Sequence, residues 1–224
     1  MTVSPDAQPG FVSATRTAYD TVAASYAEIA EGMLAESTWD RAMLNAFAEL
    51  VGAAGPVGDL GCGPGRIAGY LASLGLDVFG VDLSPGMVEV ARRAWPGLKF
   101  EVGSLLALEL ADESLAGALA WYSIIHTPPA RLPEVFAELA RVLLPGGRLL
   151  LAFQVGDEVR HIEQGYGHEG LSLDAYRLRP ELIEQLAADA GFTIESRLVR
   201  APEPPHEKVP QAYLVARKGC VQDG

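Results

Sequence analysis

The chain has 224 residues, of which 49% are hydrophobic and 21% charged, so it predicts one α/β domain with a substantial core and excludes a disordered chain. A net charge of −12 disfavours nucleic acids and anionic membranes as partners, because a strongly acidic surface repels both. The two cysteines form neither a disulfide framework nor a metal-binding pattern, and no secretion signal or membrane-spanning run is evident. We therefore expect a cytoplasmic protein without a metal.

The N-terminal segment, residues 1–54, predicts helices that cover a site on the rest of the domain. Residues 1–10 are polar and are expected to fray. In residues 12–30, Val22, Tyr26 and Ile29 recur at helical spacing and define an inner face, and residues 39–51 predict a second amphipathic helix.

Strands and helices alternate over residues 55–154. Short apolar runs predict strands at 57–60, 76–81, 98–102, 115–122 and 148–153, with helices at 67–74, 84–95 and 132–143. Alternating elements of this kind form a parallel sheet that helices cover on both faces. This segment is therefore expected to be a Rossmann-like, three-layer core that binds a cofactor.

The C-terminal part completes one domain that spans residues 1–224. Residues 155–178 are polar, with glycines and aromatics, and are expected to form an insertion or lid. Residues 179–218 predict a helix at 180–190 and strands at 192–199 and 213–217. The proline-rich loop between these two strands predicts an antiparallel connection at one edge of the sheet.

The most informative motif is a glycine-rich turn, residues 59–66 (DLGCGPGR), between a predicted strand and a predicted helix. Glycines at alternate positions let the backbone approach a ligand closely, and the start of a helix directs N–H groups toward it. The next strand ends at Asp82, whose carboxylate can accept hydrogen bonds from a ribose diol. The motif therefore predicts a nucleoside-containing cofactor at the carboxyl ends of the strands.

Two cofactor classes share this layout, and the third glycine separates them. A dinucleotide fingerprint needs its third glycine at the position where this chain has Arg66. The third glycine of this chain is Gly65, one residue earlier. Asp59 disfavours a pyrophosphate and favours a ligand with an ammonium group. The spacing of the glycines and the position of Asp59 therefore favour S-adenosylmethionine over NAD as the cofactor. An NAD-dependent oxidoreductase is the alternative.

Residues 59–66, Val81 to Ser84 with Met87, and residues 143–149 (LLPGGRL) together resemble the motifs of class I S-adenosylmethionine-dependent methyltransferases. The resemblance implies a mostly parallel seven-stranded sheet with an antiparallel edge strand. It also implies cofactor contacts from Gly61, Asp82 and the loop after the third strand, where Ser104 stands in place of a common acidic residue. The candidate cofactor-binding residues are Tyr26, Asp59, Gly61, Cys62, Gly63, Gly65, Arg66, Asp82, Leu83, Met87, Ser104, Leu105 and Trp121.

Several of these residues have a purely structural alternative. Asp59 is either a ligand contact or a strand-end carboxylate, and Asp82 is either a ribose contact or a helix cap. Cys62 is better explained as a small buried side chain than as a nucleophile. Tyr19 and Tyr26 either cover the cofactor or only pack their helix against the sheet.

The end of the fourth strand supplies the candidate catalytic residues, His126 and Tyr122. In the family that the chain resembles, the loop after this strand faces the methyl group that is transferred. An imidazole titrates near neutral pH, so His126 is the candidate general base, and a loop-orienting histidine is the alternative. His161, Tyr166, His168, Tyr176 and Arg177 are candidates for a substrate pocket.

The sequence thus predicts methyl transfer to a small molecule, with an oxygen, nitrogen or carbon nucleophile and a slight preference for a hydroxyl, by a monomer or homodimer. In-line positioning supplies most of the acceleration in such a displacement, so a base is needed only where the nucleophile must lose a proton. A non-catalytic adenosylmethionine-binding protein is the alternative from another class.

Overall fold

The computed structural model describes residues 9–203 and 207–220, so the expectation that the first residues fray lies almost wholly outside the described part. The helices are α1 (Gly10–Ala30), α2 (Met33–Glu36), α3 (Thr38–Val51), α4 (Arg66–Ser73), α5 (Pro85–Ala94), α6 (Leu132–Val142) and α7 (Pro180–Asp189), with short 3₁₀ turns η2 (Ile124–His126) and η3 (Pro129–Arg131). The strands are β1 (Val57–Leu60), β2 (Val78–Asp82), β3 (Lys99–Val102), β4 (Leu115–Trp121), β5 (Leu143–Gln154), β6 (Val159–Gly165), β7 (His168–Tyr176), β8 (Phe192–Arg200) and β9 (Gln211–Lys218).

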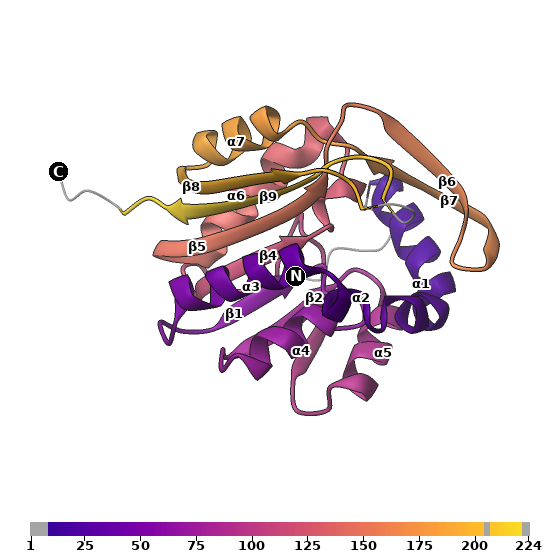
Figure 1. The fold of residues 1–224 in the computed structure, drawn as a ribbon, viewed down its shortest axis with the longest axis horizontal. Helices are drawn as coiled ribbons and strands as arrows, with labels where there is room; N and C mark the ends of the chain where they lie inside the picture. The colour runs from indigo at the N-terminus through magenta and orange to yellow at the C-terminus, as the bar shows by residue number, and fades with distance from the viewer. Residues whose placement is uncertain (1–8, 204–206, 221–224) are drawn as a thin grey trace.

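Seven of the strands form one twisted sheet in the order β3-β2-β1-β4-β5-β9-β8 (Figure 1). The first five pair in parallel, as expected for strands joined by helical crossovers. Strand β9 is antiparallel to both β5 and β8, so the expected antiparallel strand lies at this side of the sheet, directly inside the edge strand β8.

Helices cover both faces of the sheet and make a three-layer domain (Figure 1). Apolar residues of α6 and α7, such as Phe136 and Ile183, pack with one face of the strands. Residues of α3, α4 and α5, such as Phe47 and Leu71, pack with the other face. In β9, Leu214 belongs to the first cluster and Tyr213 to the second, because successive side chains of a strand point to opposite faces.

The segment expected to be an insertion or lid is a β-hairpin, β6–β7, which forms a second, two-stranded sheet. Its inner face packs on α1 through Leu171 and Leu173, which contact the same buried cluster as Ala18 and Val22. A period-two signal is present in the sequence, because Leu171, Leu173 and Ala175 alternate with polar residues. The alternation is short and lies among glycines and polar residues, so it did not predict a strand.

Two further details differ from the predicted elements. Strand β5 begins at Leu143 instead of Arg148, and its pairing with β4 shifts register where the Pro-Gly-Gly turn lies. On α1, Ile29 is exposed and not on the buried face, whereas Val22 is buried as expected.

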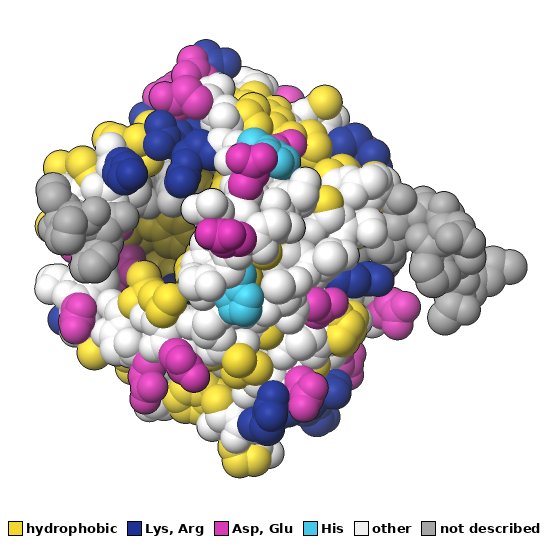
Figure 2. Space-filling model, turned by 90° about the vertical axis from the view of Figure 1, so that its right-hand side faces the viewer, with side chains coloured by type: hydrophobic (Ala, Val, Ile, Leu, Met, Phe, Trp, Pro, Cys, Tyr) yellow, Lys and Arg dark blue, Asp and Glu magenta, His cyan; other side chains and the backbone are white. Residues whose placement is uncertain are grey.

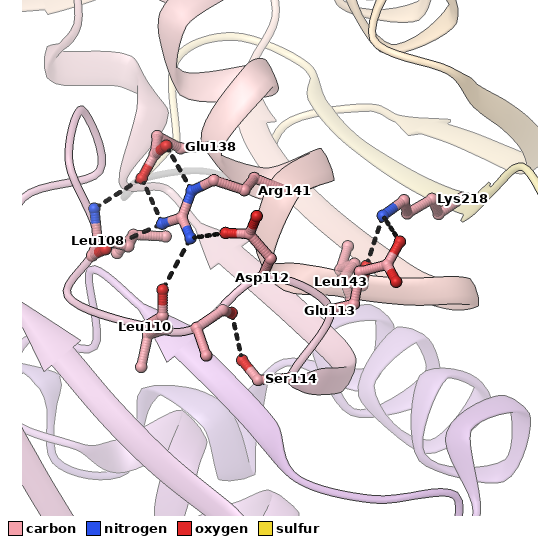
Figure 3. Close-up of polar contacts among 10 residues, drawn as sticks. Leu108, Leu110, Asp112, Glu113, Ser114, Glu138, Arg141, Leu143 and Lys218 are labelled. Carbon is pink, nitrogen blue, oxygen red and sulfur yellow. Dashed lines mark hydrogen bonds and ion pairs between the residues drawn. The ribbon is translucent and has the colours of Figure 1, made fainter.

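The loop that follows β3 is fixed to α6 by Arg141 (Figure 3). The Arg141 guanidinium donates to the carbonyl oxygens of Leu108 and Leu110 and to the carboxylate of Asp112, at 2.7–2.9 Å. Glu138 binds Arg141 through both carboxylate oxygens and also accepts from the backbone N–H of Leu108 at 2.8 Å. These bonds hold the second half of the loop against the body of the domain, and the first residues of the loop, 103–106, border the site described next.

Candidate functional site

A cavity of about 860 Å³ opens at the carboxyl ends of the parallel strands. Figure 2 shows it as a hollow with hydrophobic side chains on its floor and Lys and Arg side chains along one edge. Its size lies in the upper part of the range usual for small-molecule sites, so it has room for a cofactor and a second small molecule. The sheet ends, α1, the hairpin and the β8–β9 connection all contribute to its lining.

The glycine-rich turn forms one wall, and two of its glycines line the cavity. At Gly61 the backbone has φ +85°, and a Cβ atom would lie 2.2 Å from the Cβ of Ser123. At Gly63 a Cβ would meet nothing nearer than a Tyr26 ring carbon at 3.8 Å, so the absent side chain leaves an open cradle between the turn and α1. The turn thus presents backbone to the cavity at both positions.

Gly65 and Cys62, which the sequence placed at the ligand, do not line the cavity. A Cβ at Gly65 would lie 2.8 Å from the Phe100 ring, so glycine is required there for packing. Cys62 is buried, its sulfur lies against Gly80, and burial raises the pKa of its thiol well above the usual value. The two contacts therefore stay predictions, and the burial of Cys62 agrees with its structural alternative.

Asp59 is likewise not part of the cavity lining and is fully buried. Its Oδ2 accepts a hydrogen bond from the N–H of Ala68, in the first turn of α4, at 3.0 Å. Burial is the main cause that raises the pKa of this carboxyl to about 7. The Oδ1 of Asp59 is buried without a hydrogen-bond partner among the described residues, so the predicted contact with an ammonium group stays a prediction beside the structural alternative, a strand-end carboxylate, which here caps α4. Because the cap already occupies this helix start, the site is less suited to a pyrophosphate.

Asp82 lies at the end of β2 and lines the cavity. Its Oδ2 accepts from the N–H of Gly63 and its Oδ1 from the N–H of Ser84, each at 2.8 Å. Burial, the largest cause, raises the pKa of the carboxyl, and the two backbone bonds oppose that effect. A carboxylate has about four acceptor positions, so two remain for donors in the cavity. Asp82 therefore both fixes the glycine turn and remains able to bind a diol.

The other predicted cofactor residues line the same cavity. They are Tyr26, Arg66, Leu83, Met87, Ser104, Leu105 and Trp121. Arg66 is the first residue of α4, and its Nη1 is buried without a hydrogen-bond partner among the described residues. The hydroxyl of Ser104 already accepts from the N–H of Leu106 at 3.2 Å.

His126 lies in η2, is 9% exposed and lines the cavity. Its Nδ1 is 2.9 Å from the carbonyl oxygen of Asp174 in β7, and its Nε2 is 2.7 Å from the hydroxyl of Tyr19 in α1. A carbonyl can only accept, so Nδ1 carries the proton and Nε2 accepts from Tyr19. Burial lowers the pKa of the imidazole, so the neutral form is favoured.

Tyr122, the other candidate catalytic residue, directly follows β4 and also lines the cavity. It is one of the few non-glycine residues with positive φ, +56°, a conformation that concentrates at functional sites. Burial raises the pKa of its phenol well above the ordinary value, so Tyr122 is suited to donate a hydrogen bond and not to act as a base.

A polar network lies beyond Tyr122. The Tyr213 hydroxyl donates to Asp40 at 2.6 Å and accepts from Arg200 at 3.1 Å. Arg200 in turn binds Glu207 through two contacts of 2.5 and 2.6 Å. The network fixes the described parts of the β8–β9 connection against α3, at the side of the cavity away from the glycine turn.

The β6–β7 hairpin and α1 form the roof of the cavity. The Tyr166 ring at the hairpin turn contacts the Tyr26 ring edge-to-face at 4.9 Å, and His168 lies 2.9 Å from the Ser25 hydroxyl. Of the hairpin residues that the sequence singled out, Tyr166 and Arg177 line the cavity. His161, His168 and Tyr176 do not.

Sequence reasoning missed part of the lining, notably Asp40, Arg160, Arg200 and Lys208. Arg200 ends β8 and Glu207 lies in the proline-rich loop that follows, and this pair of opposite charges was the available signal. For Asp40 the sequence held no such signal, because an acidic residue in the first turn of a helix is expected for helix stability alone.

The described residues, 9–203 and 207–220, contain no group of three or more His, Cys, Asp or Glu side chains placed to hold a metal ion. None of the described helices combines the length and hydropathy needed to cross a membrane.

Comparisons with known proteins agree with this site. Residues 57–147 match a family described as a methyltransferase domain. An uncharacterized methyltransferase of Mycobacterium tuberculosis is 39% identical over 126 residues, which are 54% of this chain and 50% of the relative. A demethylmenaquinone methyltransferase of Beutenbergia cavernae is 36% identical over 51% of this chain and 46% of its own length. The chain thus spans about half the length of the curated relatives it matches.

Solved structures share the whole fold at low sequence identity. A Burkholderia thailandensis 1,6-didemethyltoxoflavin-N1-methyltransferase, with its substrate and S-adenosylhomocysteine bound, has a TM-score of 0.74 and 19% identity and covers 97% of this chain and 93% of its own. The [4+2]-cyclase SpnF has a TM-score of 0.70 and 19% identity over 92% of this chain and 95% of its own. The fold alone therefore does not decide the reaction.

The match over residues 57–147, the relatives and the fold together support a member of the class I S-adenosylmethionine-dependent methyltransferase family. S-adenosylmethionine is the cofactor of that family, and the residues present fit it. The open cradle at Gly63, the spare acceptor positions of Asp82 and the unpartnered Nη1 of Arg66 match a backbone-contacted sulfonium ligand with a ribose diol and a carboxylate.

Proposed function

We propose that this protein transfers a methyl group from S-adenosylmethionine to a small-molecule acceptor that loses a proton in the reaction. The observation that carries the proposal is the position of His126. A neutral imidazole, held at both nitrogens, lines the same cavity as the glycine turn and Asp82.

The cofactor would be held on the side of the cavity formed by the turns after β1, β2 and β3. Asp82 would accept from the ribose hydroxyls, Arg66 would pair with the methionine carboxylate, and Ser104 would accept from the adenine amino group. When bound, S-adenosylmethionine supplies an electrophilic methyl group on a sulfonium. Asp59 would act indirectly, by capping α4 under the glycine turn.

His126 would take the proton that the acceptor releases. The Asp174 carbonyl keeps Nδ1 protonated, so the lone pair on Nε2 is available and the imidazolium that forms retains a hydrogen bond. Tyr19 holds that lone pair in this structure at 2.7 Å, and its hydroxyl would either yield to the acceptor or relay the proton. Burial raises the pKa of the Tyr19 phenol, which keeps it a hydrogen-bond donor.

The acceptor would occupy the part of the cavity between Tyr122, α2 and the β8–β9 connection. Tyr122 would donate a hydrogen bond to it, and the aromatic rings of Trp121 and Tyr19 would contact it. A hydroxyl or another protic group is favoured, because a carbon or amine nucleophile has less need of a base such as His126. The names of the relatives, a demethylmenaquinone methyltransferase and a toxoflavin N-methyltransferase, support an acceptor of small-molecule size.

The test is turnover. The wild type and His126→Ala are incubated with S-adenosylmethionine and a panel of phenols, alcohols and amines, and products are scored by mass spectrometry for the gain of one methyl group. The proposal predicts at least one methylated phenol or alcohol with the wild type. If the cofactor binds and no acceptor in the panel gains a methyl group, the proposal is contradicted in favour of a non-catalytic binding protein.

A further inference from the structure

Basic side chains gather at one edge of the cavity although the chain as a whole is acidic. Arg160, Arg177 and Lys208 all line the cavity, in a protein whose net charge is −12. Figure 2 shows Lys and Arg side chains along the edge of the hollow, beside its hydrophobic floor. Our assignment of cofactor contacts uses none of these three residues.

The register of the hairpin places the two arginines on one face. Arg160 pairs with Ala175, and the N–H of Arg177 donates to the carbonyl of Glu158 at 2.9 Å, so the two arginines belong to neighbouring cross-strand positions two residues apart. Residues two apart along a strand point to the same side. That side is the inner face of the hairpin, which also carries Leu173 and Ala175.

Arg177 is costly to bury in its present surroundings. Its side chain is 15% exposed, its one ion pair is a 3.2 Å contact with a Glu158 side chain that is 58% exposed, and its Nε is buried without a partner among the described residues. A charge removed from water needs close partners to offset the lost hydration. Gly156 leaves room for this side chain, since a Cβ there would lie 2.9 Å from the Cβ of Arg177.

The lining also carries the acids Glu31, Glu36, Asp40, Asp82, Glu203 and Glu207, but among the described residues none of them forms an ion pair with Arg160, Arg177 or Lys208. Arg200 is already matched by Glu207, and Asp40 is engaged with Tyr213. In the described residues, Arg160 and Lys208 have no ion pair within 4.0 Å. Arg160 and Arg177 share one face of the hairpin and are here called the basic edge, which therefore has donors to spare.

We propose that the methyl acceptor carries an acidic group, and that the basic edge binds it while the apolar floor holds the rest of the molecule. Guanidinium groups match the geometry of carboxylate and phosphate oxygens and bind them with charge-assisted hydrogen bonds. This inference rests on the proposed function and narrows its acceptor to an anionic, partly apolar compound.

The test uses two fluorescent probes that share one ring system. 1-Anilinonaphthalene-8-sulfonate carries a sulfonate, and N-phenyl-1-naphthylamine lacks it. Their affinities are measured for the protein saturated with adenosylhomocysteine, for Arg160→Gln and Arg177→Gln, and for Arg179→Gln as control. Arg179 is exposed, lies two residues beyond Arg177 and does not line the cavity, so its replacement makes the same change in net charge.

The wild type and Arg179→Gln should bind the sulfonate about tenfold or more tightly than the neutral probe. Arg160→Gln and Arg177→Gln should each lose most of that preference with the neutral probe unaffected. Equal affinities of the wild type for both probes, or equal losses in Arg177→Gln and Arg179→Gln, would overturn the proposal.

Competition then separates the two sources of negative charge. Displacement of the sulfonate by 1-naphthoate assigns a carboxylate acceptor, and displacement by 1-naphthyl phosphate assigns a phosphate. If neutral 1-naphthol displaces it as well as either anion does, the basic edge has no role. Adenosylhomocysteine binding is followed in the same samples by melting temperature, so a failure of the cofactor assignment is seen separately from a failure of the basic edge.

Discussion

The two sides of the cavity are built in different ways. The cofactor side, defined by Gly61, Gly63, Asp82 and Ser104, comes from turns that follow successive parallel strands, and much of it is backbone. The acceptor side, defined by His126 and the basic edge, is assembled from η2, the hairpin and the β8–β9 connection.

The difference teaches where specificity resides. Local chain geometry fixes the cofactor side, and the match to the methyltransferase domain covers most of it, at residues 57–147. Contacts between remote segments fix the acceptor side: Tyr19 and His126 are 107 residues apart, and His126 and Asp174 are 48 apart. The cofactor side is therefore expected to tolerate few backbone changes, and the acceptor side to respond to single side chains.

The largest effect should come from the acceptor side, at His126. Replacing it with alanine should lower turnover by about 10²–10⁴-fold with little change in cofactor affinity, because a general base acts only on the proton transfer. His161→Ala removes an exposed imidazole outside the cavity and is the matched control. Steady-state kinetics measures turnover and calorimetry measures cofactor affinity. Wild-type turnover in His126→Ala would show that His126 has only a structural role.

The pH profile sharpens that prediction. A base is active when unprotonated, and burial lowers the pKa of His126 below the ordinary value of 6.5. Turnover of the wild type should therefore stay high at neutral pH and fall on acidification with a midpoint below 6.5. In His126→Ala this fall in turnover at acidic pH should be absent. A midpoint above 6.5 in the wild type would contradict a buried, neutral imidazole.

On the cofactor side, Asp82→Ala should weaken adenosylhomocysteine binding by about 1.5–3 kcal/mol, the value of hydrogen bonds to a charged group. Asp77→Ala, at the exposed residue directly before the same strand, is the control and should bind as the wild type does. Calorimetry measures both affinities. Equal affinities of the two variants would show that Asp82 serves only the turn, through Gly63 and Ser84.

Gly61→Ala and Gly75→Ala separate backbone strain from crowding in the glycine turn. Both glycines have positive φ, +85° and +91°, but a Cβ at Gly75 meets nothing within 4 Å, whereas one at Gly61 meets Ser123. Gly75→Ala should cost about 1–2 kcal/mol of unfolding free energy, and Gly61→Ala about 1–3 kcal/mol more. Urea unfolding tests this, and equal losses would mean that the turn moves to accommodate a side chain.

The smallest effect concerns the hairpin as a mobile cover. Limited trypsin digestion should cut first within residues 156–176, and adenosylhomocysteine with a methylated acceptor should slow that cut several-fold. Tyr166→Ala should speed it, because the ring contact with Tyr26 is lost, and Tyr166→Phe should not. Cutting that is indifferent to the ligands and to Tyr166 would argue against a cover.

The cofactor side of the cavity could be predicted from the sequence to a larger extent than the acceptor side. Strand β1 and the helices α5 and α6 were predicted to within a residue or two, because periodicity and the Ser-Pro helix start are local signals. Asp82 and the glycines at 61 and 63 were found for the same reason. The direction of a side chain in a fully buried strand is not a local property, so the sequence did not show that Asp59 binds the first turn of α4.

The acceptor side was only partly predictable. His126 was located from its place after β4, but its partners Tyr19 and Asp174 depend on how α1 and the hairpin pack. Arg160 reaches the cavity only because of the register of a hairpin whose alternation is short. Such contacts arise from tertiary packing, which residue patterns do not specify.

The central claim is that the glycine turn and Asp82 form an adenosylmethionine site, and titration calorimetry of the wild type with adenosylhomocysteine and with NAD tests it most directly. The account predicts saturable binding of adenosylhomocysteine, with a rise in melting temperature by linkage to the folded state, and no binding of NAD. Binding of NAD together with no binding of adenosylhomocysteine at millimolar concentration would contradict it.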